Sequence, residues 1–268
     1  MKPLLSFFIL AGATASAFAA SEFDCMIEPA QTVELRSPVS GILQQVHARR
    51  GQLVNKDDVL ATIESSVESS AAEAALYRAQ AQGALLTASN KVTAAREKAR
   101  RMDELLKEEF VSAQARDDAR AELRLAEAEL VTAQENSKIA KVEHRQSVDQ
   151  LNRRVLRSPF DGAVVDQYLD PGSMVDGGEG KKPILKIAQT NPLVVRAILP
   201  FTLFPELHLE DVVVVVPEKP FTRIIDARIK TIDRVIDSAA GTFGIQVELD
   251  NAKQDLPAGI RCKLRLGK

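Results

Sequence analysis

Few side chains in this sequence could do covalent or metal chemistry. It contains two cysteines, Cys25 and Cys262, and three histidines, His47, His144 and His208. An even pair of cysteines is a disulfide candidate in an oxidising compartment, and two half-buried strand thiols are the alternative. The histidines are scattered along the chain, and neither a glycine-rich phosphate loop nor a His/Cys/Asp cluster accompanies them. We therefore predict no catalytic residues, no cofactor and no metal site.

The N-terminus and the net charge restrict where the protein acts. Lys2, the apolar run 4–10 and Ala17-Phe18-Ala19 have the order of a secretory signal peptide, so we predict a signal over 1–19. An uncleaved membrane anchor is the alternative, but the apolar core is short for a membrane span. We expect an exported, soluble periplasmic protein, held at the inner membrane through protein partners. A net charge of −2 gives no general attraction to nucleic acid.

The longest element that the sequence predicts runs from 65 to 154. This stretch contains no proline and one glycine, Gly83, and it divides once near Glu109–Ser112. Apolar residues recur at alternating steps of three and four on both sides, which is typical of a coiled-coil seam. Two helices of about 40 residues would form an antiparallel hairpin roughly 60 Å long, which predicts a projecting arm. The predicted seam is Ala71, Ala74, Ala81, Leu85, Ala88, Val92, Ala95, Ala99, Met102 and Leu106, then Ala119, Leu123, Ala126, Leu130, Ala133, Ala140 and Leu151.

The segments that flank this arm repeat each other. Residues 35–41 (Leu-Arg-Ser-Pro-Val-Ser-Gly) match 156–162 (Leu-Arg-Ser-Pro-Phe-Asp-Gly) at an offset of 121, and Gly51 matches Gly172 at the same offset. Each copy alternates short β-rich runs with Pro/Gly turns, but neither has enough apolar residues to bury a face alone. We therefore predict that 35–64 and 155–190 pack together as one small β-sandwich.

The remaining segment, 191–268, also has β character. Four runs, 212–216, 223–232, 243–249 and 260–266, are β-branched or alternate between apolar and polar residues. Turn residues separate these runs, which predicts a small β-barrel, with one short helix over Phe201–Leu209.

The repeat, with its Ser-Pro-x-x-Gly, Gly-x-x-Val and Leu-x-x-Ile-Glu motifs, resembles a lipoyl- or biotinyl-carrier domain. Carrier domains hold a modifiable lysine on the turn between the halves, whereas here 64–68 (Glu-Ser-Ser-Val-Glu) offers none. Ser65 and Glu68 instead have the spacing of a helix capping box. A lipoyl-like sandwich split by a helical hairpin resembles the periplasmic adaptor, or membrane fusion protein, family of tripartite efflux pumps, which includes the HlyD and AcrA groups. This resemblance covers about 30–268, nearly all of the mature chain.

The resemblance implies an elongated, multi-domain α+β fold. An antiparallel coiled-coil hairpin (65–154) is inserted in a lipoyl-like β-sandwich, or barrel-sandwich hybrid (35–64 and 155–190), and a β-barrel (191–268) follows. Residues 20–34 would supply an N-terminal strand to the barrel and bring Cys25 towards Cys262, so we expect no free thiol in the oxidised protein. Since the chain ends at Lys268, we expect the further membrane-proximal domain of many family members to be missing or vestigial.

The resemblance also assigns a docking site at the end of the arm. Adaptors that dock on TolC-type channels carry an Arg, a Leu four residues later and a Ser seven further on, a spacing that Arg101, Leu105 and Ser112 match. Arg101 and Leu105 would lie one turn apart on one helix face. The alternative is that Leu105 belongs to the seam, Arg101 is solvated and Ser112 is only a helix N-cap.

The expected function is that of a non-catalytic adaptor subunit of an RND-type or related efflux or secretion pump. Its expected partners are an inner-membrane transporter of RND or ABC type, a TolC-type outer-membrane channel and further copies of itself in a ring, as a trimer or hexamer. Two alternatives remain: an exported coiled-coil scaffold or cell-envelope-binding protein, and a lipoyl or biotinyl carrier.

Overall fold

The computed structural model describes residues 22–177, 181–221 and 223–267, so the predicted signal peptide lies outside the described residues. The chain divides into two compact units. The first lies within Met1–Val33, Asp161–Ala163 and Ala188–Lys268, and contains the barrel. The second lies within Glu34–Phe160 and Val164–Ile187, and contains the helices and most of the sandwich.

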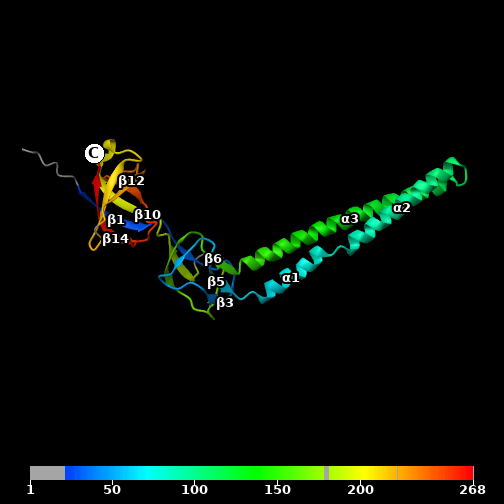
Figure 1. Cartoon of the computed structure of the whole chain (residues 1–268), viewed down its shortest axis with the longest axis horizontal. Helices are drawn as coiled ribbons and strands as arrows, with labels where there is room; N and C mark the ends of the chain where they lie inside the picture. Colours follow the sequence, from blue (N-terminus) through cyan, green and yellow to red (C-terminus); the bar gives the residue numbers. More distant parts are fainter. Residues whose placement is uncertain (1–21, 178–180, 222, 268) are drawn as a thin grey trace, which may run out of the picture. The chain divides into compact units, whose positions relative to one another are not determined.

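Six antiparallel strands form a closed barrel in the first unit, in the order β1-β10-β13-β12-β11-β14. Figure 1 labels β1, β10, β12 and β14 of this barrel. Along β10, Val195, Ala197 and Leu199 are buried while Arg196 and Ile198 are exposed, and this alternation places one face of the strand in the core. The strands are β1 (Glu22–Pro29), β10 (Leu193–Pro200), β11 (Val212–Pro217), β12 (Ile225–Ile232), β13 (Thr242–Leu249) and β14 (Ile260–Leu266).

The strand β1 closes this barrel, since it pairs with β10 on one side and with β14 on the other. Residues from the start of the chain thus complete a sheet whose other strands all follow Leu193. The short helix expected over Phe201–Leu209 is a 3-10 helix, η1, that ends earlier, at Glu206. It contains Pro205, which cannot donate a backbone hydrogen bond.

Two four-stranded sheets, β2-β9-β7-β4 and β6-β5-β3-β8, build the sandwich. The 121-residue repeat relates them strand for strand, because β2, β7 and β4 correspond to β6, β3 and β8, and β9 to β5 after a three-residue shift. Each sheet therefore takes two strands from each copy, and neither copy forms a sheet alone. The strands are β2 (Thr32–Leu35), β3 (Gly41–Val46), β4 (Leu53–Val54), β5 (Val59–Ile63), β6 (Val155–Arg157), β7 (Gly162–Gln167), β8 (Met174–Val175) and β9 (Leu185–Ala188).

The two copies also use equivalent hydrogen bonds. Ser37 and Ser158 are both buried, and each donates its hydroxyl to the carbonyl two residues later. Gly51 and Gly172 both adopt positive φ, at 81° and 90°, and each donates its amide to a carbonyl of the other copy. Glycine adopts this backbone conformation at little cost, which explains why the repeat has it at both turns.

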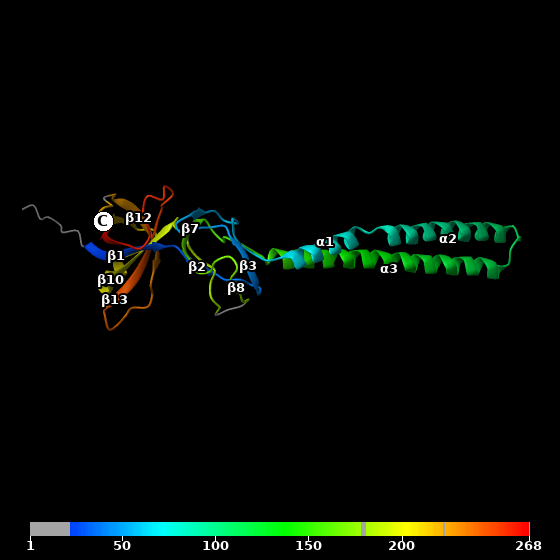
Figure 2. The same ribbon diagram turned by 90° about the horizontal axis from the view of Figure 1, so that it is seen from below.

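Three helices form the arm: α1 (Ser66–Gln80), α2 (Gly83–Lys107) and α3 (Ala113–Asn152). Figures 1 and 2 show α1 and α2 following each other along α3, and both helices contact α3. The expectation of two helices of equal length was therefore wrong for the first half of the arm. The break falls at Ala81, which is extended with ψ of 118° and lies two residues before Gly83, a residue of low helix propensity.

The break changes which residues face α3. Ala88, Val92, Ala95 and Ala99 of α2 are buried, as the predicted seam requires. In α1, however, Ala72 and Ala75 are buried rather than Ala71 and Ala74, so the predicted seam is wrong there by one residue. The predicted capping box is also wrong, because the Ser65 side chain makes no capping bond. Of the helices that the structure describes, none combines the length and the apolar character that a membrane crossing needs.

Candidate functional site

The chain reverses direction at the end of the arm through a short turn, 108–112. The turn begins as α2 ends: the amide of Glu109 donates to the Leu106 carbonyl at 3.1 Å and the amide of Phe110 to the Leu105 carbonyl at 2.9 Å. Glu109 adopts a positive φ of 59°, the left-handed conformation that often terminates a helix. These bonds hold the turn close to the last residues of α2. The end of α2 and the turn therefore form one surface, residues 101–112, here called the tip.

Large apolar side chains are exposed at the tip. Met102 and Leu106 are partly buried along the helix packing, whereas Leu105 is 36% exposed beside them. Phe110 is 74% exposed, the largest value for an aromatic residue in the described chain. Sequence reasoning missed Phe110. The sequence feature that could have identified it is a bulky aromatic residue in a largely polar turn, where few neighbouring side chains can cover it.

Arg101 is exposed on the same helix as Leu105, one turn earlier. Its neighbour Arg100 bonds Glu97 and Glu104, with the shortest contact at 2.8 Å. In contrast, no ion-pair partner of Arg101 is present among the residues that the structure describes. Its side chain therefore has free hydrogen-bond donors, and it lines a shallow groove between α2 and α3 together with the exposed Leu125.

Ser112 has a local structural role. It is the N-cap of α3, and its hydroxyl accepts a hydrogen bond from the Ala115 amide at 3.2 Å. This is the role that sequence reasoning set out as the alternative to docking. Arg101, Leu105 and Ser112 all lie at the arm end where α2 gives way to α3, and their part in docking stays a prediction.

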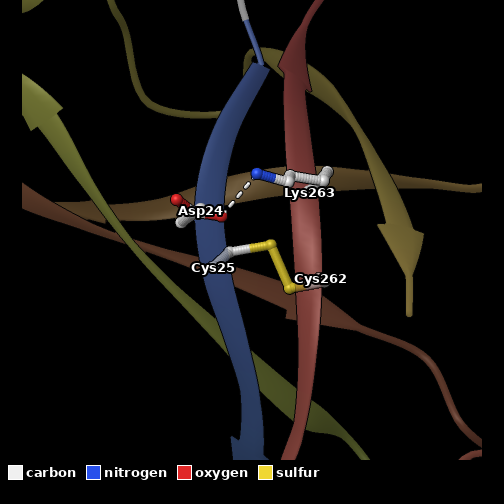
Figure 3. The surroundings of a disulfide bond; sticks show 4 residues. All are labelled: Asp24, Cys25, Cys262 and Lys263. Carbon is white, nitrogen blue, oxygen red and sulfur yellow. Dashed lines mark hydrogen bonds and ion pairs between the residues drawn. A yellow bond between two sulfur atoms is a disulfide. The ribbon is translucent and has the colours of Figure 1, made fainter.

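A second cluster, in the barrel, contains the cysteines. Figure 3 shows Cys25 on β1 joined to Cys262 on β14 by a disulfide, with the flanking Asp24 and Lys263 paired on the same two strands. The Lys263 ammonium lies 2.6 Å from an Asp24 oxygen, and its hydrogen bond and charge lower the pKa of that carboxyl. Glu22 and Arg265 form a further ion pair across the same strands at 2.6 Å.

The remaining chemical candidates stay apart. His47, His144 and His208 lie in the sandwich, on α3 and in the barrel unit. Across residues 22–177, 181–221 and 223–267, no group of three or more His, Cys, Asp or Glu side chains could hold a metal ion. At the position of the carrier-domain turn, the whole arm connects β5 to β6, which are antiparallel neighbours in one sheet.

Comparison with known proteins agrees with this architecture. The family model for the CzcB-like barrel-sandwich hybrid domain matches residues 31–189. The multidrug resistance protein MdtA of Shigella boydii serotype 18 is 29% identical over 237 residues, which cover 84% of this chain and 52% of MdtA. An uncharacterized protein of Haemophilus influenzae is 26% identical over 242 residues, covering 90% of this chain and 56% of that protein. The chain thus spans about half the length of the curated relatives it matches.

Among solved structures, MacA from Actinobacillus actinomycetemcomitans has a similar fold, with a TM-score of 0.75 at 21% identity over 92% of this chain and 77% of that one. The matched sandwich, the inserted arm and the barrel together define a class of protein. The chain belongs to the membrane fusion protein, or periplasmic adaptor, family, and it carries a CzcB-like barrel-sandwich hybrid domain. This confirms the resemblance that the repeat and its flanking motifs indicated.

Proposed function

We propose that this chain is the adaptor subunit of a tripartite efflux or secretion pump, which bridges an inner-membrane transporter and a TolC-type outer-membrane channel. The observation that carries the proposal is the tip, where Arg101 has no ion-pair partner among the described residues and Leu105 and Phe110 are exposed. A surface of this kind suits binding to another protein better than catalysis. The proposed role is therefore that of a structural adaptor rather than of an enzyme.

The arm would reach its partner as a coiled coil. Ion pairs between the helices support this, because Lys91–Glu129 at 2.8 Å and Lys98–Glu122 at 2.6 Å link α2 to α3 beside the buried alanines. Exposed pairs of this kind add little stability individually but favour one register. We propose domain boundaries at 1–19 for the signal peptide, 20–34 for the barrel's first strand, 35–64 and 155–190 for the sandwich, 65–154 for the hairpin, and 191–268 for the barrel.

Each tip residue has a distinct part in docking. The guanidinium of Arg101 can donate several hydrogen bonds to carboxylates or carbonyls of a partner helix pair. Leu105 would fill a hole between the partner's helices, and Phe110 would bury a large apolar area. Ser112 would place its hydroxyl at the interface while it caps α3.

The adaptor would act in the periplasm as a ring of three or six copies, with an RND-type or ABC-type transporter as its inner-membrane partner. The name of the relative MdtA, a multidrug resistance protein, supports an efflux role. Cargo would move through the channel that the ring assembles rather than through a pocket in one chain.

A photo-crosslinking experiment in cells tests the proposal. A photoreactive amino acid at Leu105 or Phe110 is expected to capture an outer-membrane channel protein, identified by mass spectrometry. The matched control is Val142, which is 59% exposed on α3 but remote in sequence from the tip, and which should not capture the channel. Capture of only self or peptidoglycan-associated proteins at the tip positions would instead indicate an envelope scaffold. An intact mass above that of the unmodified mature chain would indicate a carrier.

Charge reversal tests the role of Arg101. Arg101→Asp is expected to abolish transport while the protein still folds and is exported, because a carboxylate repels the acceptors that the guanidinium would bind. Arg145→Asp makes the same charge change at an exposed position near the other end of α3 and should retain transport. Full transport in the Arg101 variant would contradict docking through this residue.

A further inference from the structure

The arm joins the sandwich through two short connections. One leads from Ile63, the last residue of β5, to Ser66, the first residue of α1. The other leads from Asn152, the last residue of α3, to Val155, the first residue of β6. Short connections between rigid elements are where hinge motion concentrates. The direction of the arm on the sandwich therefore depends on what else ties these two junctions together.

One side chain ties them. Arg154 lies in the second connection, and its Nη2 pairs with Oε1 of Glu68, in the first turn of α1, at 2.5 Å. Its Nη1 donates to the carbonyl of Ser40, in the turn before β3, at 3.2 Å. Its backbone carbonyl accepts the amide of Ile63 at 2.8 Å. A single residue thus contacts the end of β5, the start of α1 and a sandwich turn.

The sequence leaves space for this guanidinium. A Cβ atom on Gly41 would lie 2.6 Å from Arg154 Nη1 and 2.8 Å from Ile63 Cγ2, so any larger residue would displace both of them. At the equivalent residue of the other copy, Gly162, an added Cβ atom would instead lie 2.3 Å from the backbone carbonyl oxygen of Ala188. The repeat thus has a glycine at both positions, and in the first copy the Arg154 guanidinium lies where a side chain on this glycine would begin.

The ion pair is sheltered from water. The side chains of Arg154 and Glu68 are only 17% and 20% exposed. In the Lys91–Glu129 and Lys98–Glu122 pairs of the arm, by contrast, every side chain is more than 40% exposed. Charge-assisted bonds with little solvent are stronger and more directional than surface pairs. Glu64 stabilises the same junction, because its Oε1 accepts the Ser66 amide at 2.9 Å and so caps α1 in place of Ser65.

We propose that Arg154, Glu68 and the Ser40 carbonyl, here called the arm latch, fix the direction of the helical arm on the sandwich. Arg154 is a positioning residue, remote in sequence from the tip that it aims. The leverage is large: α3 is 40 residues long, about 60 Å, so a tilt of about 10° at its base moves the tip by about 10 Å. The consequence for channel docking rests on the proposed function, whereas the latch itself does not.

Distance measurements by double electron–electron resonance test the latch in the purified, oxidised full chain. Spin labels are attached to cysteines introduced at Arg50, in the sandwich, and Gln134, midway along α3, both of which are exposed. Gln134 lies about 27 Å along the helix from its base, so a tilt of about 10° moves it by about 5 Å. The latch predicts a narrow distance distribution in the parent protein. Arg154→Ala is expected to broaden it or shift its mean by about 5 Å or more.

Two further variants separate the latch from general stability. Gly41→Ala keeps every charge but displaces the guanidinium and crowds Ile63 Cγ2, and it should broaden the distribution as Arg154→Ala does. Arg153→Ala removes a neighbouring exposed arginine and should leave the distribution unchanged. If Arg154 served only stability, Arg154→Ala would lower the melting temperature while the folded protein kept its narrow distribution, and that result overturns the proposal. Because no channel or transporter is present, failure of the adaptor proposal would leave this outcome unaffected.

Discussion

Cys25 and Cys262 lie directly opposite each other on β1 and β14 and form a disulfide between strands that are 237 residues apart in sequence. Since β1 closes the barrel, this bond fastens the strand that completes the sheet. Both cysteines are buried, at 8% and 4% exposure, so dissolved reductants reach them only when the barrel opens.

The disulfide is expected to stabilise the barrel. Replacing both cysteines with alanine is expected to lower the free energy of unfolding by about 2–4 kcal/mol, since a cross-link over a long loop restricts the unfolded chain. Denaturant titration of the oxidised protein and the double variant measures the difference. Thiol titration of the purified protein should find no free thiol unless denaturant and reductant are both added. Two titratable thiols in the oxidised native protein would contradict the bond.

The Asp24–Lys263 pair predicts a pH dependence. The pKa of Asp24 is lowered by Lys263, so its carboxylate stabilises the barrel above its unfolded pKa and loses that contribution as the pH falls through the folded value. The pKa of Lys263 is raised by Asp24, so its ammonium stabilises the barrel below its unfolded pKa and loses that contribution as the pH rises through the folded value. The pair therefore stabilises the barrel across the middle of the pH range.

Replacing Lys263 with methionine tests this assignment. The variant should raise the pKa of Asp24 towards the ordinary carboxyl range, as measured by NMR titration of its side-chain carboxyl. Lys253→Met, at an exposed position in a loop, is the control and should leave the pKa unchanged. An unaltered Asp24 pKa in the Lys263 variant would show that another group depresses it.

Ser112 allows capping and docking to be separated. Ser112→Ala removes the acceptor of the Ala115 amide and is expected to cost about 1 kcal/mol of stability. Ser112→Asp keeps a capping oxygen and favours a helix N-terminus, so its thermal stability should match the parent. If the hydroxyl also contacts a channel, Ser112→Asp will lose transport despite its stability. Normal transport in that variant would restrict Ser112 to capping.

A pair of glycine substitutions is predicted to act in opposite directions. No atom lies within 4 Å of a Cβ placed on Gly83, in the first turn of α2, so Gly83→Ala should stabilise the arm by about 0.5–1 kcal/mol. A Cβ on Gly162 would lie 2.3 Å from the Ala188 carbonyl oxygen, so Gly162→Ala should destabilise the sandwich. Denaturant unfolding of the two variants measures both signs, and a gain in stability for Gly162→Ala would contradict the close approach.

Much of the architecture could be predicted because turn chemistry is local. The Pro and Gly residues shared by 35–51 and 156–172 mark turns in both copies, and the structure pairs the strands between them into matching sheets. The seam of α2 was predictable as well, since Val92 stands among alanines spaced at three and four residues. These features depend on neighbours in sequence, which is what periodicity and turn residues report.

The errors have equally physical causes. In α1, alanines at 71, 72, 74 and 75 fit two registers equally well, and only the packing against α3 decides between them. The break before α2 was missed because Ala81 and Gln82 are good helix formers and a single glycine costs only about 1 kcal/mol. The capping box is absent because Glu64 caps α1 in place of Ser65, and Glu68 pairs with Arg154, 86 residues away in sequence, a partner that no local pattern reports.

The pairing of β5 with β6 has a consequence for how the chain folds. These neighbouring strands are separated in sequence by the whole arm, and closing a disordered loop of about 90 residues costs roughly 4 kcal/mol of chain entropy. The arm needs only its five-residue turn to begin pairing α2 with α3, which costs roughly 2–3 kcal/mol less. If α2 and then α1 pair with α3 progressively from the tip towards the sandwich, the end of β5 and the start of β6 are brought together before the sandwich forms. The arm then acts as a folding template for the sheet into which it is inserted, so slower refolding is expected of variants that weaken its helix contacts.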